Sequence, residues 1–261
     1  MSTAPAVVFT HTHNRLGMPD TMVGESGYVL GTEYTPVGDV QRLWLGTSET
    51  NPKQVTLTNQ YESGTRRLRM SSVTDTSHGY KLQELTYGYD DAGNILSISD
   101  PTTLGGTGKA DFQCFGYDGY RRLKHAWTPK TANCATTART AANLDGAAPY
   151  WNSYTYSDSG LRKTETRHTT SGDITTDYRY GENGHPPHAL TSTSTPTTAA
   201  AAAVTNTYAY DPLGNTISRP GTRGAQTLTW DVEGQAADGQ RTGRSAGRRF
   251  RHGLPVLSLT P

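Results

Sequence analysis

A short phrase recurs along this 261-residue chain and constrains its fold more than any other feature. The phrase is an aromatic residue, an acidic or small polar residue, two variable positions, a glycine, and then a polar and an apolar residue. Its clearest copies are Tyr89-Asp90-Asp91-Ala92-Gly93-Asn94-Ile95 and Tyr210-Asp211-Pro212-Leu213-Gly214-Asn215-Thr216-Ile217. Self-similarity at a spacing of a few tens of residues is typical of stacked supersecondary units. We therefore expect function to lie in the assembled surface.

The strong copies have the sequence pattern of a β-hairpin. Large apolar residues alternate with small ones before the turn, which places Leu85, Tyr87 and Tyr89 on one face of a strand. The Asp90 side chain can accept hydrogen bonds from the following backbone N–H groups, and Gly93 can adopt a positive φ. Residues 95–98 then resume as a second strand. The motif predicts a hairpin with its glycine at the bulge position of a short loop.

Weaker copies keep these roles while losing sequence identity. They are Tyr117 with Asp118, Tyr156 with Gly160, Tyr180 with Gly184, and Trp230 with Asp231 and Gly234, and degenerate members begin at Tyr34 and Tyr61. Two successive intervals, from Tyr61 to Tyr89 and from Tyr89 to Tyr117, are each 28 residues long. A longer interval after Tyr117 predicts a loop insertion at about 128–150, and a Thr-, Ser-, Pro- and Ala-rich stretch predicts a second at 191–204.

Composition favours an all-β chain with a thin core. Hydrophobic residues make up 33% of the chain, and 15 tyrosines accompany only 4 phenylalanines, which suits a sheet with one wet face. The formal net charge of +1 gives no general electrostatic reason to expect nucleic acid or an anionic membrane as a partner. The sequence has no apolar run long enough for a membrane span and no secretion signal at residues 1–9.

The two cysteines, Cys114 and Cys134, are too few for a disulfide framework. A single disulfide between them in an oxidising compartment and two free thiols are both compatible with the sequence.

Motifs that carry chemistry are weak. His11 with His13, and His185 with His188, lack a carboxylate or cysteine at ligand spacing, so we predict no metal site. Residues 105–109 lack the glycine offset of a phosphate-binding loop, and we interpret them as a flexible loop between strands. No Gly-x-Ser-x-Gly elbow is present. We predict no catalytic residues, no cofactor and no enzymatic activity.

The motif series, together with Trp127-Thr128-Pro129 and Ala148-Pro149-Tyr150-Trp151-Asn152, resembles RHS/YD-repeat proteins, particularly those of actinobacteria, over roughly residues 20–235. The resemblance implies antiparallel hairpin repeats forming part of a β-sheet that spirals into a hollow shell, as in bacterial RHS toxins, toxin-complex C components and teneurins. In that family the shell encloses a C-terminal toxin or forms an extracellular adhesion scaffold. It implies a structural shell segment of a secreted or cell-surface parent, with the remaining repeats or another β-edge, and a toxin cargo, as partners.

Two departures from the family accompany this resemblance. The segment Asp211-Pro212-Leu213-Gly214-Asn215 has Asn where the family's self-cleavage motif has Leu, so we expect the Asp211 carboxylate to cap a turn. Residues 1–19 form a lead-in, and residues 236–261 read as an Arg-rich irregular tail where another strand would follow in the family. The second departure predicts a truncated or frame-disrupted gene.

The tyrosines support two interpretations. Stacked at equivalent positions of successive repeats, they would form an aromatic ladder that stabilises the sheet. An exposed ladder would instead complement sugar rings, and the alternative function is therefore a secreted or wall-associated module that binds carbohydrate or protein.

Overall fold

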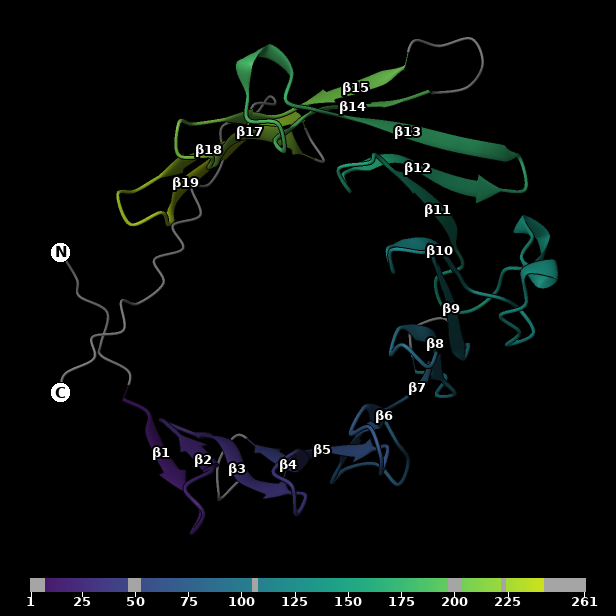
Figure 1. The fold of residues 1–261 in the computed structure, drawn as a ribbon. Helices are drawn as coiled ribbons and strands as arrows, with labels where there is room; N and C mark the ends of the chain where they lie inside the picture. The colour runs from purple at the N-terminus through teal and green to yellow at the C-terminus, as the bar shows by residue number, and fades with distance from the viewer. Residues whose placement is uncertain (1–7, 47–52, 105–107, 197–202, 222–223, 242–261) are drawn as a thin grey trace. The chain divides into compact units, whose positions relative to one another are not determined.

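The computed structural model of the chain describes residues 8–46, 53–104, 108–196, 203–221 and 224–241. Its strands and short 3-10 helices (η) are shown in Figure 1. In chain order they are β1 (Thr10–His13), β2 (Pro19–Val23), β3 (Gly27–Tyr34), β4 (Val40–Gly46), β5 (Gln54–Tyr61), β6 (Leu68–Asp75), β7 (Gln83–Tyr89), β8 (Ile95–Asp100), β9 (Asp111–Tyr117), β10 (Leu123–Trp127), η1 (Thr136–Ala138), η2 (Ala141–Asn143), β11 (Trp151–Tyr156), β12 (Arg162–Thr169), β13 (Gly172–Tyr180), η3 (Glu182–Gly184), β14 (Leu190–Thr195), β15 (Val204–Thr207), β16 (Ala209–Tyr210), β17 (Thr216–Gly221), β18 (Gly224–Trp230) and β19 (Ala236–Arg241).

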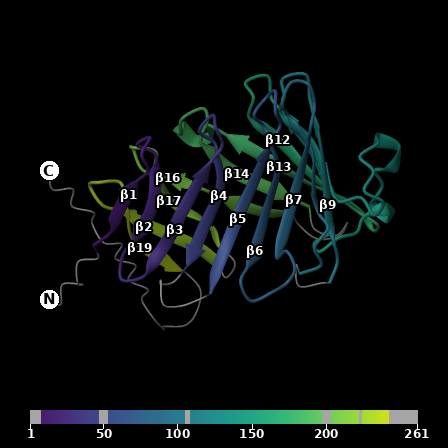
Figure 2. The same ribbon diagram turned by 90° about the horizontal axis from the view of Figure 1, so that it is seen from below.

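The prediction of an all-β fold built from antiparallel hairpins is confirmed. Strand order follows chain order, with β1 to β15 in one sheet and β16 to β19 in a second. Figure 2 shows β3 to β7 side by side in this order. The chain divides into two compact units, Met1–Asn152 and Ser153–Pro261. In the described part of the chain, no helix has the length and apolar character needed to cross a bilayer.

The buried core of the first unit is small and lies where β9 and β10 meet the segment 128–150. Cys114, Ala126, Trp127 and Thr128 are each at most 4% exposed. Most other strand residues are only half-buried, as expected for a thin sheet with one wet face. Segment 128–150 contains no strand, only η1, η2 and an isolated bridge between Pro129 and Leu144.

Strands occur in both terminal segments, of which the sequence predicts only the tail 236–261 to be irregular. β1 lies within the expected lead-in 1–19, and β19 lies within the expected tail 236–261. β1 (Thr-His-Thr-His) is exposed at every residue, so it has no apolar face that a sequence pattern could reveal. Backbone pairing with β18 likewise orders β19 without an apolar alternation. The remaining tail, 242–261, lies outside the described residues.

The second predicted loop, 191–204, is also partly wrong. β14 continues to Thr195, and its Thr191 and Thr193 side chains are buried, so a Thr-rich stretch here is strand rather than loop. Threonine has a high β propensity because its branched side chain packs well on a pleated surface. The alanine run falls largely in residues 197–202, outside the described residues.

Candidate functional site: the linked hairpin turns

The motif folds as a short turn capped by its acidic residue. The Asp90 N–H donates to the Asn94 carbonyl and the Gly93 N–H to the Asp90 carbonyl, both at 3.0 Å. The Asp90 carboxylate accepts hydrogen bonds from the backbone N–H of Asn94 at 2.8 Å and from its side-chain amide at 2.7 Å. These four bonds recur in the turn 211–215, so the Asp211 carboxylate is a turn cap, as predicted.

Hydrogen bonding to the asparagine side chain lowers the pKa of both Asp90 and Asp211. The register of β7 and β8 shifts between Gly88 and Tyr89, on the strand side of the turn and not at Gly93, where the motif predicts the bulge. These aspartates therefore stay ionised in their structural role.

One position of the turn is always left-handed. Gly93, Gly160, Gly214 and Gly234 have φ between 75° and 89°. In the Tyr117 copy this position is Arg121, with φ of 62°, although the sequence offers Gly119 two residues earlier. The turn closed by Asp118 keeps its geometry, since the Asp118 carboxylate accepts from the Arg122 backbone N–H at 2.9 Å. The left-handed residue therefore stays at the same position of the turn, although the glycine of this copy lies two residues earlier.

The motif aromatic links one hairpin to the one before it. It is the last residue of its strand, and its hydroxyl or indole N–H donates to the carbonyl of the first residue of an earlier strand. The six bonds join Tyr34 to Pro19, Tyr61 to Val40, Tyr89 to Leu68, Tyr117 to Ile95, Tyr210 to Leu190 and Trp230 to Thr216, at 2.5–2.9 Å. Burial is the main cause that raises the pKa of Tyr89, Tyr117 and Tyr210.

The contact that repeats along the motif is this polar link, whereas sequence reasoning expected stacked rings. The stacked pair Tyr87–Tyr89, with centroids 6.5 Å apart, comes from one strand. The acceptors are main-chain carbonyls, which leave no trace in a sequence. The only sequence feature that marks these links is the position of the aromatic residue, directly before the first residue of the turn.

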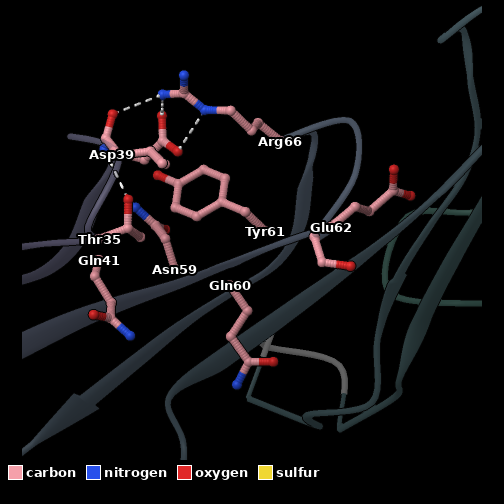
Figure 3. A pocket seen from close by; sticks show the side chains of 10 residues that line it. Thr35, Asp39, Gln41, Asn59, Gln60, Tyr61, Glu62 and Arg66 are labelled. Carbon is pink, nitrogen blue, oxygen red and sulfur yellow. Dashed lines mark hydrogen bonds and ion pairs between the residues drawn. The ribbon is translucent and has the colours of Figure 1, made fainter.

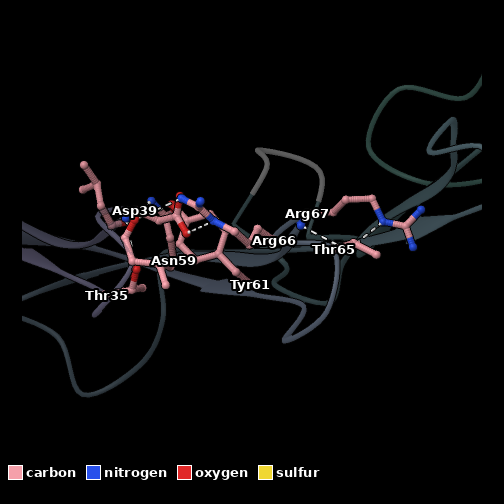
Figure 4. Close-up of polar contacts among 9 residues, drawn as sticks. Thr35, Asp39, Asn59, Tyr61, Thr65, Arg66 and Arg67 are labelled. Carbon is pink, nitrogen blue, oxygen red and sulfur yellow. Dashed lines mark hydrogen bonds and ion pairs between the residues drawn. The ribbon is translucent and has the colours of Figure 1, made fainter.

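Arginines add a second set of links between neighbouring turns. Arg66 donates to both carboxylate oxygens of Asp39, at 2.5 and 3.0 Å, as Figures 3 and 4 show. It also donates to the Val37 carbonyl at 3.2 Å. Hydrogen bonding from Arg66 lowers the pKa of Asp39, and the same bond raises the pKa of Arg66. Arg67 continues the series toward the next turn: its guanidinium donates to the Asp90 carbonyl at 2.9 Å.

Arg67 also fixes its own turn and the neighbouring aromatic. It donates to Glu62 at 2.7 Å and lies 4.8 Å from the centroid of the Tyr89 ring. Hydrogen bonds from Thr65 and Arg67 lower the pKa of Glu62. Arg67 is thus shared by two hairpins, through charge on one side and a cation–π contact on the other.

A shallow pocket of about 320 Å³ lies between the turns 35–39 and 62–66 (Figure 3). Its acid, Asp39, is held by Arg66, and its Tyr61 hydroxyl donates to the Val40 carbonyl at 2.7 Å. Asn59 donates to the same carbonyl at 3.1 Å. Neither the acid nor the hydroxyl is placed as a general base or nucleophile, because each is committed to holding a turn. The pocket is a consequence of the linked turns.

The other predicted motif residues divide into two groups. Tyr156 with Gly160, and Trp230 with Asp231 and Gly234, border turns of the same form, in which Ser157 or Asp231 accepts the capping hydrogen bond. Tyr180 and Gly184 do not border such a turn. Here Gly181 is left-handed and its missing Cβ faces Pro187 at 3.0 Å, because the loop to β14 is longer and contains two prolines.

Cys114 and Cys134 are joined by a disulfide, with Cα atoms 5.5 Å apart. The bond attaches the segment 128–150 to β9. The same segment is held at its base by Thr128, whose N–H donates to the Tyr150 carbonyl at 3.0 Å and whose hydroxyl accepts from the Tyr150 N–H at 3.0 Å. Among the residues that the structure describes, no group of three or more His, Cys, Asp or Glu side chains is placed to hold a metal ion.

No protein-family model and no curated protein match the chain. Among solved structures, it is similar to the crystal structure of TcdB2-TccC3 without hypervariable C-terminal region, with a TM-score of 0.47 and 18% identity over 93% of this chain and 12% of that chain. For the crystal structure of TcdB2-TccC3-TEV the values are 0.40 and 16% over 88% and 14%. For a porin-like protein from Bacteroides uniformis they are 0.36 and 11% over 88% and 86%. This chain therefore spans a small part of the TcdB2-TccC3 chains, and TM-scores below 0.5 assign no function.

Proposed function

We propose that this chain is a structural segment of an RHS/YD-repeat β-shell whose parent protein encapsulates or presents a C-terminal toxin. The observation that carries the proposal is the link from six of the motif aromatics to the carbonyl of the first residue of an earlier strand. A side chain that makes the same contact to a neighbouring hairpin in several repeats has a structural role, because in a repeat protein each unit is stabilised by its nearest neighbour.

The motif series supports the choice of family. Three copies, at Tyr89, Tyr117 and Tyr210, keep the Tyr-Asp start, the capped turn, a left-handed residue four positions after the tyrosine and the hydroxyl link to an earlier strand. The Cys114–Cys134 disulfide supports a secreted or cell-surface parent, since such bonds persist in oxidising compartments. In this role the turns act as a scaffold and need no chemical turnover. The partners are the remaining shell repeats, through the sheet edges, and the toxin cargo.

Binding of carbohydrate by a tyrosine ladder is less well supported. The motif hydroxyls donate to main-chain carbonyls, and the most exposed tyrosine, Tyr120 at 83%, lies in a turn rather than at a motif aromatic position. A flat aromatic row for sugar rings would need the rings themselves exposed.

Limited proteolysis of the longest natural translation product that contains this sequence tests the proposal. We expect the segment C-terminal to the repeats to resist protease until the β-sheet region unfolds, as a shielded cargo would. Cleavage of that segment at the same rate in native and denatured protein would contradict encapsulation. In parallel, this chain is assayed on a polysaccharide panel, where saturable binding would favour the carbohydrate-binding alternative.

A further inference from the structure

Three side chains on neighbouring strands of the second unit form a continuous hydrogen-bond chain. The Ser153 hydroxyl on β11 lies 2.8 Å from His168 Nε2 on β12, and His168 Nδ1 lies 2.9 Å from an oxygen of Asp173 on β13. The strands β11, β12 and β13 are consecutive in the sheet (Figure 1). A nucleophile within hydrogen-bond reach of a base that is oriented by a third group is the geometric signature of an activated hydroxyl.

Strand register, rather than sequence spacing, brings these residues together. His168 is directly opposite Asp173 in the β12–β13 pair. Nearby cross-strand pairs are hydroxyl to hydroxyl, such as Thr155 with Thr164 at 2.6 Å and Thr166 with Thr175 at 2.9 Å. Those pairs hold two alcohols of similar basicity. The contact at Ser153 differs because its partner is an imidazole, whose ring nitrogen can act as a base toward the hydroxyl.

Exposure of the three side chains suits this role. His168 is largely covered, with 14% of its side chain exposed, whereas the Asp173 side chain is 58% exposed. Ser153 is half-buried. With the imidazole proton on Nδ1 donated to Asp173, Nε2 is left to accept the Ser153 proton.

We propose that Ser153 is an activated nucleophile that is acylated by small, unhindered esters, with His168 as general base and Asp173 as a positioning residue. The Ser153 oxygen bonds to the ester carbonyl carbon while its proton passes to His168 Nε2. The ester C–O bond then breaks, and the alcohol leaves with that proton. Water, deprotonated by His168, attacks the acyl group, releasing the acid and restoring Ser153.

A fluorophosphonate probe tests this proposal on the intact chain. In labelling, the Ser153 oxygen bonds to phosphorus, fluoride leaves, and His168 takes the proton. We expect Ser153 to be labelled at least about 100-fold faster than Ser159, a turn serine whose hydroxyl lies 2.8 Å from that of Ser157, in keeping with the usual effect of a general base. Peptide mapping by mass spectrometry identifies the labelled serine.

Three variants complete the test. Ser153→Ala should abolish labelling, and Ser159→Ala is the matched control that should leave it unchanged. His168→Ala should lower the labelling rate about 100-fold, and added imidazole should restore part of it, which a purely structural loss would not allow. Each variant is first shown to be folded by circular dichroism. Equal labelling of Ser153 and Ser159, or undiminished labelling in folded His168→Ala, would overturn the proposal.

Discussion

Trp44 and Trp127 both lie on strands of the first unit, and each has an arginine over its ring, yet their surroundings differ. Trp44 on β4 is half-buried, faces Gly31 across the strand pair, and has Arg42 at 5.6 Å from its ring centroid. Trp127 on β10 is 2% exposed and has Arg139 from the insertion 128–150 at 5.0 Å. Burial lowers the pKa of Arg139.

This difference separates two ways of stabilising one sheet. The hairpins between β3 and β8 rely on neighbour-to-neighbour contacts, namely capped turns, the aromatic links and shared arginines. The region of β9 and β10 adds a covering segment held by a disulfide and creates the fully buried side chains. Local polar contacts keep the repeats in register, while burial of apolar area supplies the larger free energy per side chain.

The largest expected change in stability comes from replacing Trp127, and Trp44 is the residue for comparison. Trp127→Ala should lower the free energy of unfolding of the first unit by about 3–5 kcal/mol, because it empties a covered site. Trp44→Ala should lower it by about 1–2 kcal/mol, because the Trp44 side chain is already partly exposed to water. Urea unfolding followed by far-UV circular dichroism measures both. Equal losses would show that the insertion adds no core.

Removing the disulfide should have the next largest effect. The double variant Cys114→Ala with Cys134→Ser should lose about 3 kcal/mol of unfolding free energy, because the unfolded chain regains the freedom of a closed loop. Thermal melts with and without a phosphine reductant measure the loss. The reductant should lower the melting temperature of the natural chain and leave that of the double variant unchanged. A natural chain insensitive to reduction would contradict this account.

Removing a single aromatic link should cost less. Tyr89→Phe deletes the hydroxyl that donates to the Leu68 carbonyl at 2.7 Å, and we expect a loss of about 1 kcal/mol. Tyr120→Phe is the control, since Tyr120 is 83% exposed and should change stability little. Chemical denaturation measures both. If the two variants lose the same amount, the link does not hold neighbouring hairpins together.

The smallest expected effect is a gain. Arg121→Gly should stabilise the chain by about 0.5–1 kcal/mol, because it relieves a left-handed backbone at the cost of some unfolded-state entropy. Gly93→Ala makes the opposite change at the equivalent position. It should lower the free energy of unfolding through backbone strain alone, since nothing lies within 4 Å of an added Cβ. Differential scanning calorimetry resolves both. A destabilised Arg121→Gly would show that contacts of Arg121 outweigh the strain.

Much of the repeat could be predicted from the sequence because its determinants are local. The caps at Asp90 and Asp211 and the positive φ of Gly93 follow from side-chain chemistry and backbone sterics within five residues. The strands β1 and β19 could not be predicted in this way, because pairing with a neighbour, not an apolar pattern, orders them.

The parts of the candidate sites that involve separate strands also escaped sequence reasoning. Arg66 meets Asp39 across 27 residues, and Ser153 meets His168 only after β11 and β12 are placed side by side. Such pairs depend on register, which one sequence reveals only where one face is apolar. The same holds for the two cysteines. Their spacing in the sequence allows a disulfide, but whether it forms depends on how the insertion lies against β9.

The aromatic links have a consequence for how such chains can change in length. The acceptor of each link is a main-chain carbonyl, so it does not depend on which residue occupies that place. Excising the 28 residues 62–89 would leave Tyr61 followed directly by Asp90, and Tyr61 would still donate to the Val40 carbonyl. The aromatic link can therefore be preserved when a hairpin is duplicated or lost by recombination, whereas an arginine link such as that from Arg66 to Asp39 depends on the residues present in both turns.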